Sequence, residues 1–403
     1  MSVKEDAKMK RIAIFCDGTW NRHDAPHPTN VVRMAQAVRL TAADGRKQHV
    51  IYQIGVGSGR GGNKLAKALD KFGGGALGWG LTENIEEVYR ALVFCYDPGD
   101  EVFIFGFSRG AYTARSLAGL IRSCGIPPRD KVGDINKAVD RYRSRDPETK
   151  PDDPESFLFR MEFSPYTATS EAEFNWRVNT KSGLCVKLNL AYLGVWDTVG
   201  ALGVPGFLTA ASILNRKYQF HDMDLSRSVS SARHAVAIDE RRRTFPPSLW
   251  DNLDRLNKLA IADEDDVSLD PATVGTWPYR QEWFPGDHST LGGGVVKDGL
   301  AAASFGWVAD GAMQAGLDMR ADVIDRIASH YNVRETLRGK KAGMFGGLLE
   351  RFWLDREGPS DAVAVSSTAS ARIACDGTYR PKTLDRVMDA VQRDLDKTPL
   401  LPD

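Results

Sequence analysis

The sequence predicts an α/β fold, in which a mostly parallel central sheet carries helices on both faces. Short apolar runs rich in Val, Ile and Phe alternate with segments of helical period through the first third of the 403 residues. The runs end at turn signals such as Asp17-Gly18 and Pro98-Gly99. The resulting β-α-β-α-β-α order implies crossover connections, and such connections join parallel strands.

The expected elements follow from these patterns in chain order. Apolar residues recur at helical spacing in the helices, whereas the strands are short apolar runs. The expected strands cover residues 11–16, 50–56, 101–106, 186–196 and 277–284. The expected helices cover residues 30–40, 82–96 (capped by Thr82), 111–122, 226–242, 299–315 and 384–395.

Composition narrows the class of protein. The 53 Lys and Arg residues balance the 53 Asp and Glu residues, so nothing in the net charge favours nucleic acid as a partner. The five cysteines form no C-x-x-C pair, which fits folding in a reducing compartment and gives no zinc site. We find no signal peptide and no membrane-spanning run, and therefore expect a cytoplasmic protein; delivery by a machine that reads no signal peptide stays open.

Residues 106–110 carry the strongest chemical signal. They read Gly-Phe-Ser-Arg-Gly, a G-x-S-x-G directly between an expected strand and an expected helix. The two glycines allow a sharp turn that lifts Ser108 above the sheet edge, at a helix N-terminus whose N–H groups stabilise a developing oxyanion. The pattern predicts that Ser108 is a nucleophile.

A nucleophilic serine of this kind is followed in the chain by an acid and then by a histidine that acts as the base. His288 lies just beyond the last expected strand, at the edge where catalytic groups gather in a parallel sheet. His221 and His234 lie in or near the expected helix 226–242, and we interpret them as solvent-facing or packed. His288 is therefore the expected base.

The acid should also follow a strand. Asp197 comes directly after the strand of residues 186–196, and an Asx turn closing that strand is its structural alternative. Asp239 falls inside an expected helix and Asp287 stands beside the base, so both fit less well. We expect Asp197 to orient the histidine.

Two backbone N–H groups are expected to form the oxyanion hole. One belongs to Arg109, directly after the serine. The other should come from the loop after an earlier strand, where Gly18 and Thr19 are the candidates.

Three other patterns receive a different interpretation. Residues 57–62 satisfy G-x-G-x-x-G but lack the later acidic residue of a dinucleotide site, so we interpret them as part of a mobile loop near the active site. The segment around Asp17 is similar to the D-x-D-G-T of aspartyl-phosphate phosphatases, but Phe15 stands where their nucleophile would be. The acidic residues 263–266 lack the glycine of a calcium loop and predict a solvated surface.

Five colinear segments, spread over about residues 11–307, also form a recognisable set. They read FCDGTWN (15–21), YDPGDEVFIFGFSRGAYTARSLAGLI (96–121), VWDTVG (195–200), AIDERRRTFPP (237–247) and FPGDHSTLGGG (284–294). Together they resemble the bacterial and fungal α/β-hydrolase family once catalogued as a domain of unknown function, whose best-understood members are type VI secretion phospholipase effectors. One departure is Thr290, since family members usually carry Asp there.

The resemblance implies an α/β-hydrolase fold and a Ser-Asp-His lipase or esterase, with Ser108, Asp197 and His288 as its triad. Lipid or phospholipid acyl esters are the implied substrates, and no metal or organic cofactor is needed. For an effector, the implied partners are a secretion spike protein and a small inhibitor (immunity) protein. Two alternatives stay open: a cytosolic esterase for small soluble esters, and a catalytically silent binding or toxin-accessory module.

We expect one domain over residues 1–403, with a C-terminal helical extension at 335–403. Residues 127–181 and 200–276 show little periodicity and are expected to form a cap over Ser108. Residues 204–214 are apolar and are followed by Arg216 and Lys217, which suits a lid in peripheral contact with anionic lipid head groups. Packing of these side chains into the core is the alternative.

Overall fold

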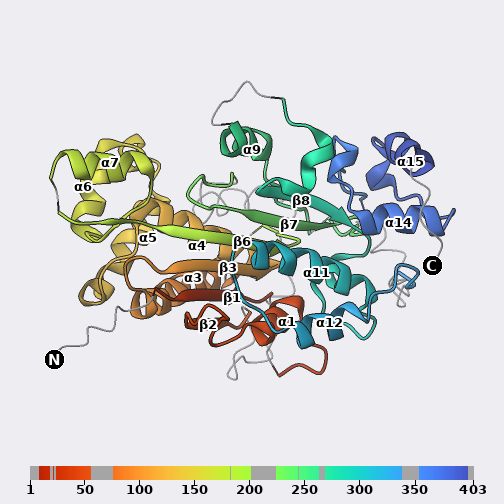
Figure 1. The fold of residues 1–403 in the computed structure, drawn as a ribbon, viewed down its shortest axis with the longest axis horizontal. Coiled ribbons are helices and arrows are strands. Elements are labelled where there is room, and N and C mark those ends of the chain that lie inside the picture. The colour runs from red at the N-terminus through yellow and green to blue at the C-terminus, as the bar shows by residue number, and fades with distance from the viewer. Residues whose placement is uncertain are drawn as a thin grey trace.

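A central parallel sheet organises the molecule (Figure 1). The computed structural model describes residues 9–18, 21, 24–55, 76–181, 183–200, 224–243, 245–262, 268–337 and 354–397. The six strands are β1 (Arg11–Cys16), β2 (Gln48–Gln53), β3 (Glu101–Phe107), β6 (Asn189–Trp196), β7 (Ala232–Ala237) and β8 (Tyr279–Phe284). Their order is β2-β1-β3-β6-β7-β8, and every pairing is parallel, which confirms the predicted fold class.

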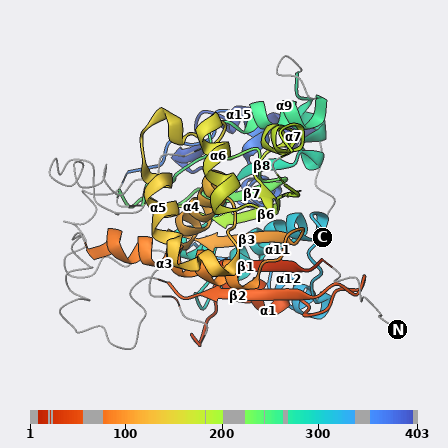
Figure 2. The same cartoon turned by 90° about the vertical axis from the view of Figure 1, so that its left-hand side faces the viewer.

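Helices cover both faces of this sheet (Figure 2). Alternate residues of β1 show why: Ile12 and Ile14 belong to the core beneath α3 and α4, whereas Ala13 and Phe15 belong to the core beneath α1, α11 and α12. The helices are α1 (Asn30–Ala37), α3 (Ala76–Cys95), α4 (Arg109–Cys124), α5 (Ile135–Arg143), α6 (Pro154–Phe163), α7 (Glu171–Asn179), α9 (Leu253–Ala262), α10 (His288–Gly292), α11 (Gly299–Gln314), α12 (Ala321–Ala328), α14 (Ser367–Cys375) and α15 (Met388–Lys397). Short 3-10 turns cover Arg129–Asp134, Pro147–Thr149, Pro271–Thr276, Ala362–Ala364 and Lys382–Leu384.

The strand order creates a topological switch point between β1 and β3. The chain leaves β1 toward β2 on one side and then returns to β3 on the other, so β1 and β3 lie side by side with their helices on opposite faces. In an open parallel sheet, ligands bind outside the carboxyl ends of the strands at such a switch point. Cys16 and Gly106 are paired in register, which brings the residues after β1 next to the residues after β3.

The expected helix over residues 226–242 is wrong. These residues contain β7, whose six residues are all buried. A central parallel strand is covered on both faces, so its sequence shows no alternation of apolar and polar residues. The period of so short a run cannot distinguish a buried strand from a buried helix. Arg233 and His234 add to the ambiguity, because both are polar and both are buried here.

Smaller differences concern element ends. α3 begins at Ala76, so Thr82 lies inside the helix rather than capping it. The strand expected over 186–196 is divided: β5 (Val186–Lys187) pairs with β4 (Thr167–Ala168), and β6 joins the main sheet. The last helix, α15, begins at Met388, after a 3-10 turn.

The expected cap over residues 127–181 is also wrong. α4 starts beside Ser108 and runs for 16 residues, or about 24 Å, before this segment begins. α6 and α7 therefore lie at the amino ends of the strands, at the left of Figure 1, where Arg160 donates to the carbonyl of Ser123 at 2.9 Å. A crossover helix returns the chain to the amino edge of a parallel sheet, so an insertion after it belongs there.

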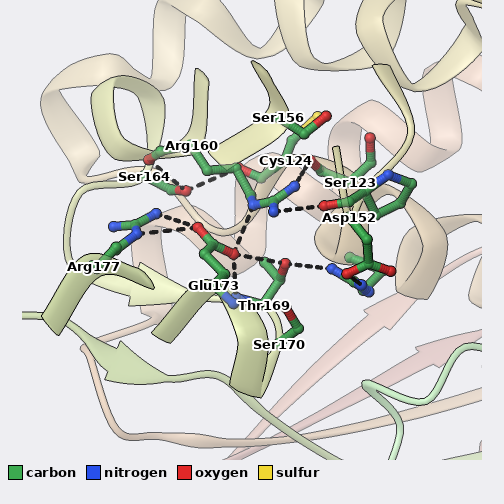
Figure 3. Close-up of polar contacts among 12 residues, drawn as sticks. Ser123, Cys124, Asp152, Ser156, Arg160, Ser164, Thr169, Ser170, Glu173 and Arg177 are labelled. Carbon is green, nitrogen blue, oxygen red and sulfur yellow. Dashed lines mark hydrogen bonds and ion pairs between the residues drawn. The ribbon is translucent and has the colours of Figure 1, made fainter. Parts of the chain in front are cut away.

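A buried ion cluster anchors this segment (Figure 3). Glu173 accepts Arg160 Nε at 2.8 Å and Arg177 Nη2 at 2.5 Å, and all three side chains are fully buried. Thr169 donates to the same carboxylate through its backbone N–H and its hydroxyl. The cluster ties α6 to α7 and, through Arg160, to the end of α4.

The C-terminal residues 354–397 pack on the β8 edge of the sheet. Trp283 of β8 bridges to Val365, and a separate apolar cluster joins β7 and β8 to α14 and α15. In the described part of the chain, no helix is both long enough and apolar enough to cross a membrane. The expected glycine loop 57–62, lid 204–214 and acidic run 263–266, together with Thr19 and His221, lie outside the described residues.

Candidate active site

Ser108 occupies the sharp turn between β3 and α4. Its φ of 59° and ψ of −124° are unusual for a residue with a side chain, and they mark a strained backbone. The flanking glycines are required by close approach: a Cβ on Gly106 would lie 2.6 Å from the Ala111 Cα, and a Cβ on Gly110 would lie 2.5 Å from the Asp17 carbonyl oxygen. This turn places the Ser108 hydroxyl at the switch point of the sheet.

His288 is the first residue of α10, which follows β8. Its Nε2 lies 2.8 Å from the Ser108 Oγ, and its Nδ1 lies 2.5 Å from Asp197 Oδ2. The rings of Phe107 and Phe245 both have centroids 4.8 Å from the imidazole centroid. The structure thus brings together the three residues that the sequence nominates, with the imidazole held between two aromatic rings.

Asp197 follows β6 in a positive-φ conformation (φ 39°) and is fully buried. Its Oδ1 accepts the backbone N–H of Ala237 at 2.9 Å, while its own N–H donates to Ala235 at 2.7 Å. Burial raises the pKa of the Asp197 carboxyl, but the Arg356 guanidinium and the His288 hydrogen bond outweigh burial and hold that pKa far below its usual value. The residue is therefore ionised at neutral pH.

Arg356 is the contact that sequence reasoning missed. Its Nη1 lies 2.6 Å from Asp197 Oδ1 and its Nη2 lies 2.9 Å from Asp197 Oδ2, so the guanidinium forms a fork on the carboxylate. It comes from the C-terminal segment, 159 residues further along the chain. No local pattern around residue 356 distinguishes it from a surface arginine.

The oxyanion candidates have different outcomes. Arg109 is the first residue of α4 and directly follows Ser108. Gly18 lies close to the serine, since a Cβ on it would be 3.2 Å from the Ser108 Cβ, but its N–H donates to Asp17 Oδ1 at 2.7 Å. The Gly18 N–H is thus already engaged in this structure, and Thr19 lies outside the described residues.

Asp17 is a supporting residue of the same loop. Its buried carboxylate accepts the Tyr52 hydroxyl at 2.7 Å and the Thr29 hydroxyl at 2.9 Å. Burial raises the pKa of Asp17, and these hydrogen bonds counteract the rise. The carboxylate holds the loop after β1 against the first turn of α1.

The rejected acids have structural partners instead. Asp239 lies after β7, not in a helix, and accepts the Gly286 N–H at 2.7 Å and the Tyr379 hydroxyl at 2.9 Å. Asp287 caps α10 and accepts both the N–H and the hydroxyl of Thr290 at 2.8 Å. Thr290 therefore supports the loop of the base through its hydroxyl.

His234 is a buried neutral imidazole on β7. Its Nε2 accepts the Thr198 N–H at 3.2 Å, and its Nδ1 lies 2.9 Å from the Gln281 amide oxygen. Burial, together with the nearby Arg115 charge, lowers the pKa of His234 to about 3. It holds the backbone directly after Asp197, which agrees with a packed role.

Comparison with known proteins gives one family. Residues 10–311 match the family described as "T6SS, Phospholipase effector Tle1-like, catalytic domain". Uncharacterized protein YEL023C of Saccharomyces cerevisiae (strain ATCC 204508 / S288c) is 26% identical over 262 residues, which cover 62% of this chain and 34% of that protein. This chain thus matches about a third of the length of that relative.

Two solved structures share weak similarity. One is an uncharacterized protein from Pseudomonas aeruginosa, at 17% identity and a TM-score of 0.40, covering 91% of this chain and 53% of that one. The other is the Tle1 effector bound to the VgrG spike of the type 6 secretion system, at 15% identity and a TM-score of 0.33, covering 70% of this chain and 51% of that one.

Proposed function

Since this chain belongs to the Tle1-like phospholipase effector family, we propose that it hydrolyses phospholipid acyl esters with Ser108 as nucleophile, His288 as base and Asp197 as orienting acid. The observation that carries the proposal is the continuous hydrogen-bond chain from the Ser108 hydroxyl through the imidazole to the Asp197 carboxylate. The family supports hydrolysis of a lipid ester, and both the reaction and the assignment of these residues to it are our proposal.

The proposed reaction has two halves. The Ser108 Oγ attacks the acyl carbonyl carbon while its proton passes to His288 Nε2. His288 then returns this proton to the departing lysolipid oxygen, which leaves the acyl group on Ser108. A water molecule then attacks the acyl carbon while His288 takes its proton. His288 returns that proton to the departing Ser108 Oγ, which releases the fatty acid and restores the serine hydroxyl.

Two features of the site favour the transition state. Negative charge that develops on the carbonyl oxygen would be stabilised by the Arg109 N–H at the start of α4. The positive charge that develops on His288 would be stabilised by the ionised Asp197, whose hydrogen bond also sets the imidazole tautomer.

The proposal is tested by labelling with a fluorophosphonate, which reacts with activated serines. The full chain should be labelled on Ser108 and should release fatty acid from phosphatidylglycerol vesicles. Ser108→Ala should lose both activities and keep its circular dichroism spectrum, because it removes one hydroxyl. Ser116→Ala, eight residues further along α4, is the matched control and should keep both.

The physical form of the substrate distinguishes the enzyme classes. A phospholipase that works at a membrane surface should hydrolyse vesicles faster than monomeric short-chain esters. The reverse preference would indicate an esterase for soluble substrates. Absence of labelling on Ser108 would indicate a silent binding module.

We also propose that the protein is exported by a type VI secretion system, with a spike protein and an immunity protein as partners. The family description supports this role. A tagged copy should leave cells that assemble the secretion apparatus and stay inside cells that lack it. Export without the apparatus would contradict the proposal.

A further inference from the structure

We propose that Arg356 is a positioning residue of the active site: it fixes the Asp197 carboxylate toward His288, and its charge offsets the carboxylate charge that the imidazole experiences. The inference rests on the proposed function, since it assigns a role in the same reaction. Arg356 lies outside residues 10–311, over which the family is matched. The C-terminal segment would thus complete an active site that the matched residues do not complete alone.

The geometry of Arg356 is that of a fixed fork. Besides its two contacts to Asp197, its Nη1 donates to the Ala237 carbonyl at 2.9 Å and its Nη2 donates to the Phe245 carbonyl at 2.8 Å. Its side chain is only 4% exposed. A planar guanidinium bound by two carbonyls and a carboxylate has one orientation, and it imposes that orientation on the carboxylate.

The carboxylate itself has no spare acceptor position. Oδ1 accepts the Ala237 N–H and Arg356 Nη1, whereas Oδ2 accepts Arg356 Nη2 and His288 Nδ1. Without Arg356, one strong contact per oxygen is lost and the carboxylate gains rotational freedom. The short contact from Oδ2 to the imidazole depends on that orientation.

Charge gives Arg356 a second effect. Asp197 and Arg356 together carry no net charge, so the imidazole faces a neutral pair rather than an isolated carboxylate. The other groups around His288 are Glu240, which accepts its backbone N–H at 3.3 Å, the adjacent Asp287, and Arg242, which forks onto Glu240 and stacks on Phe245. These groups already carry one more negative than positive charge, and loss of the guanidinium charge would increase that excess, which favours the protonated imidazole.

The segment that carries Arg356 is anchored independently. Tyr379 donates to Asp239, and the Thr383 hydroxyl donates to the Ile238 carbonyl at 2.9 Å, so two further residues of this segment bind the loop after β7. These anchors keep the segment in place when Arg356 alone is changed.

The test compares Arg356→Met, Arg356→Lys and Arg372→Met in the full chain. Arg372 is the matched control: it is similarly buried in the same segment, and it donates to the carbonyls of Val333 and Glu335 rather than to Asp197. For each variant we would measure kcat, KM and the fluorophosphonate labelling rate from pH 5 to 9, with circular dichroism to select folded protein.

We expect Arg356→Met to lower kcat about 10- to 100-fold with little change in KM, because only the group that orients His288 is affected. The acid limb of its pH profile should move up by about one unit. Arg356→Lys should keep the acid limb, since it keeps the charge, and should lose part of kcat, since lysine has no fork. Arg372→Met should lose stability but keep kcat and the profile.

Several results would overturn the inference. These are an Arg356→Met variant with unchanged kcat and profile, or an Arg372→Met variant with the same losses. If Arg356→Met does not fold, the Arg356→Lys result decides, and full kcat in that variant would remove the positioning role. Failure of the proposed function looks different, because the parent protein itself would then not be labelled on Ser108.

Discussion

Glu173 and Asp197 are both buried carboxylates held by arginine, but they lie at opposite ends of the sheet and differ in charge balance. Glu173, at the amino ends of the strands, is bound by Arg160, Arg177 and Thr169, and none of these three side chains is a base (Figure 3). Asp197, at the carboxyl ends, is bound by one arginine and by the Ala237 N–H, and it also contacts an imidazole. An arginine holds the carboxylate at both sites. Of the two carboxylates, Asp197 is the one that also contacts a histidine.

The comparison shows what separates a structural ion cluster from one that can support chemistry. In the Glu173 cluster the carboxylate accepts hydrogen bonds from Arg160, Thr169 and Arg177, which remain donors at neutral pH. These bonds fix α6 against α7. In the Asp197 cluster one acceptor position is left for His288, whose other nitrogen reaches Ser108. Three predictions test this distinction.

The largest effect is expected at Asp197. Asp197→Asn keeps the shape of the side chain but removes the charge and gives the imidazole the wrong hydrogen-bond partner, so kcat should fall by about 10⁴-fold. Steady-state hydrolysis of phospholipid vesicles measures it. Asp310→Asn, an equally conservative change in the ion pair with Arg233, should keep kcat. An Asp197→Asn variant with most of its activity would exclude this residue from the mechanism.

Glu173→Gln should instead affect stability. It leaves two buried guanidinium groups without a counter-charge, and the free energy of unfolding should fall by about 3–5 kcal/mol. Urea titration measures this change, and kcat of the folded fraction should be unchanged. The control is Glu171→Gln on the same helix, whose ion pair with Lys187 is exposed and should contribute about 0–1 kcal/mol. A loss of kcat in folded Glu173→Gln would contradict the distinction.

The smallest effect concerns His234, the neutral neighbour of the Asp197 loop. Its pKa of about 3 in the folded chain lies below the ordinary value near 6.5, so only the unfolded chain binds a proton as the pH falls through 6.5. Stability from this residue is full above pH 6.5 and declines toward pH 3. Between pH 7.5 and 5.5 the decline should be about 1.4 kcal/mol. His234→Gln should lack this component, as urea titrations at both pH values would show; an equal decline in the two proteins would refute it.

The parts of the site that sequence reasoning predicted are those with local signatures. The G-x-S-x-G turn is recognisable in the sequence because the close backbone approach at Gly106 and Gly110 leaves no space for a side chain, so both positions must be glycine. Asp197 and His288 each follow a strand, and parallel strands bring their carboxyl ends to one edge. Order along the chain then selected them from the alternatives.

The parts that were missed depend on distant contacts. β7 is covered on both faces, so its pattern is set by neighbours and not by its own period. Arg356 pairs with a residue 159 positions away, and nothing beside it in the sequence reports that contact. The misplaced cap has a different cause: residues 127–181 follow a crossover helix, and that position alone assigns them to the amino edge.

The chain distance between Asp197 and Arg356 also has a consequence during translation. A ribosome synthesises Ser108, Asp197 and His288 well before it synthesises Arg356. On our proposal, the nascent chain therefore holds all three reacting groups for some time without the guanidinium that aligns them. An enzyme able to attack phospholipids would then reach full activity only after residue 356 has left the ribosome.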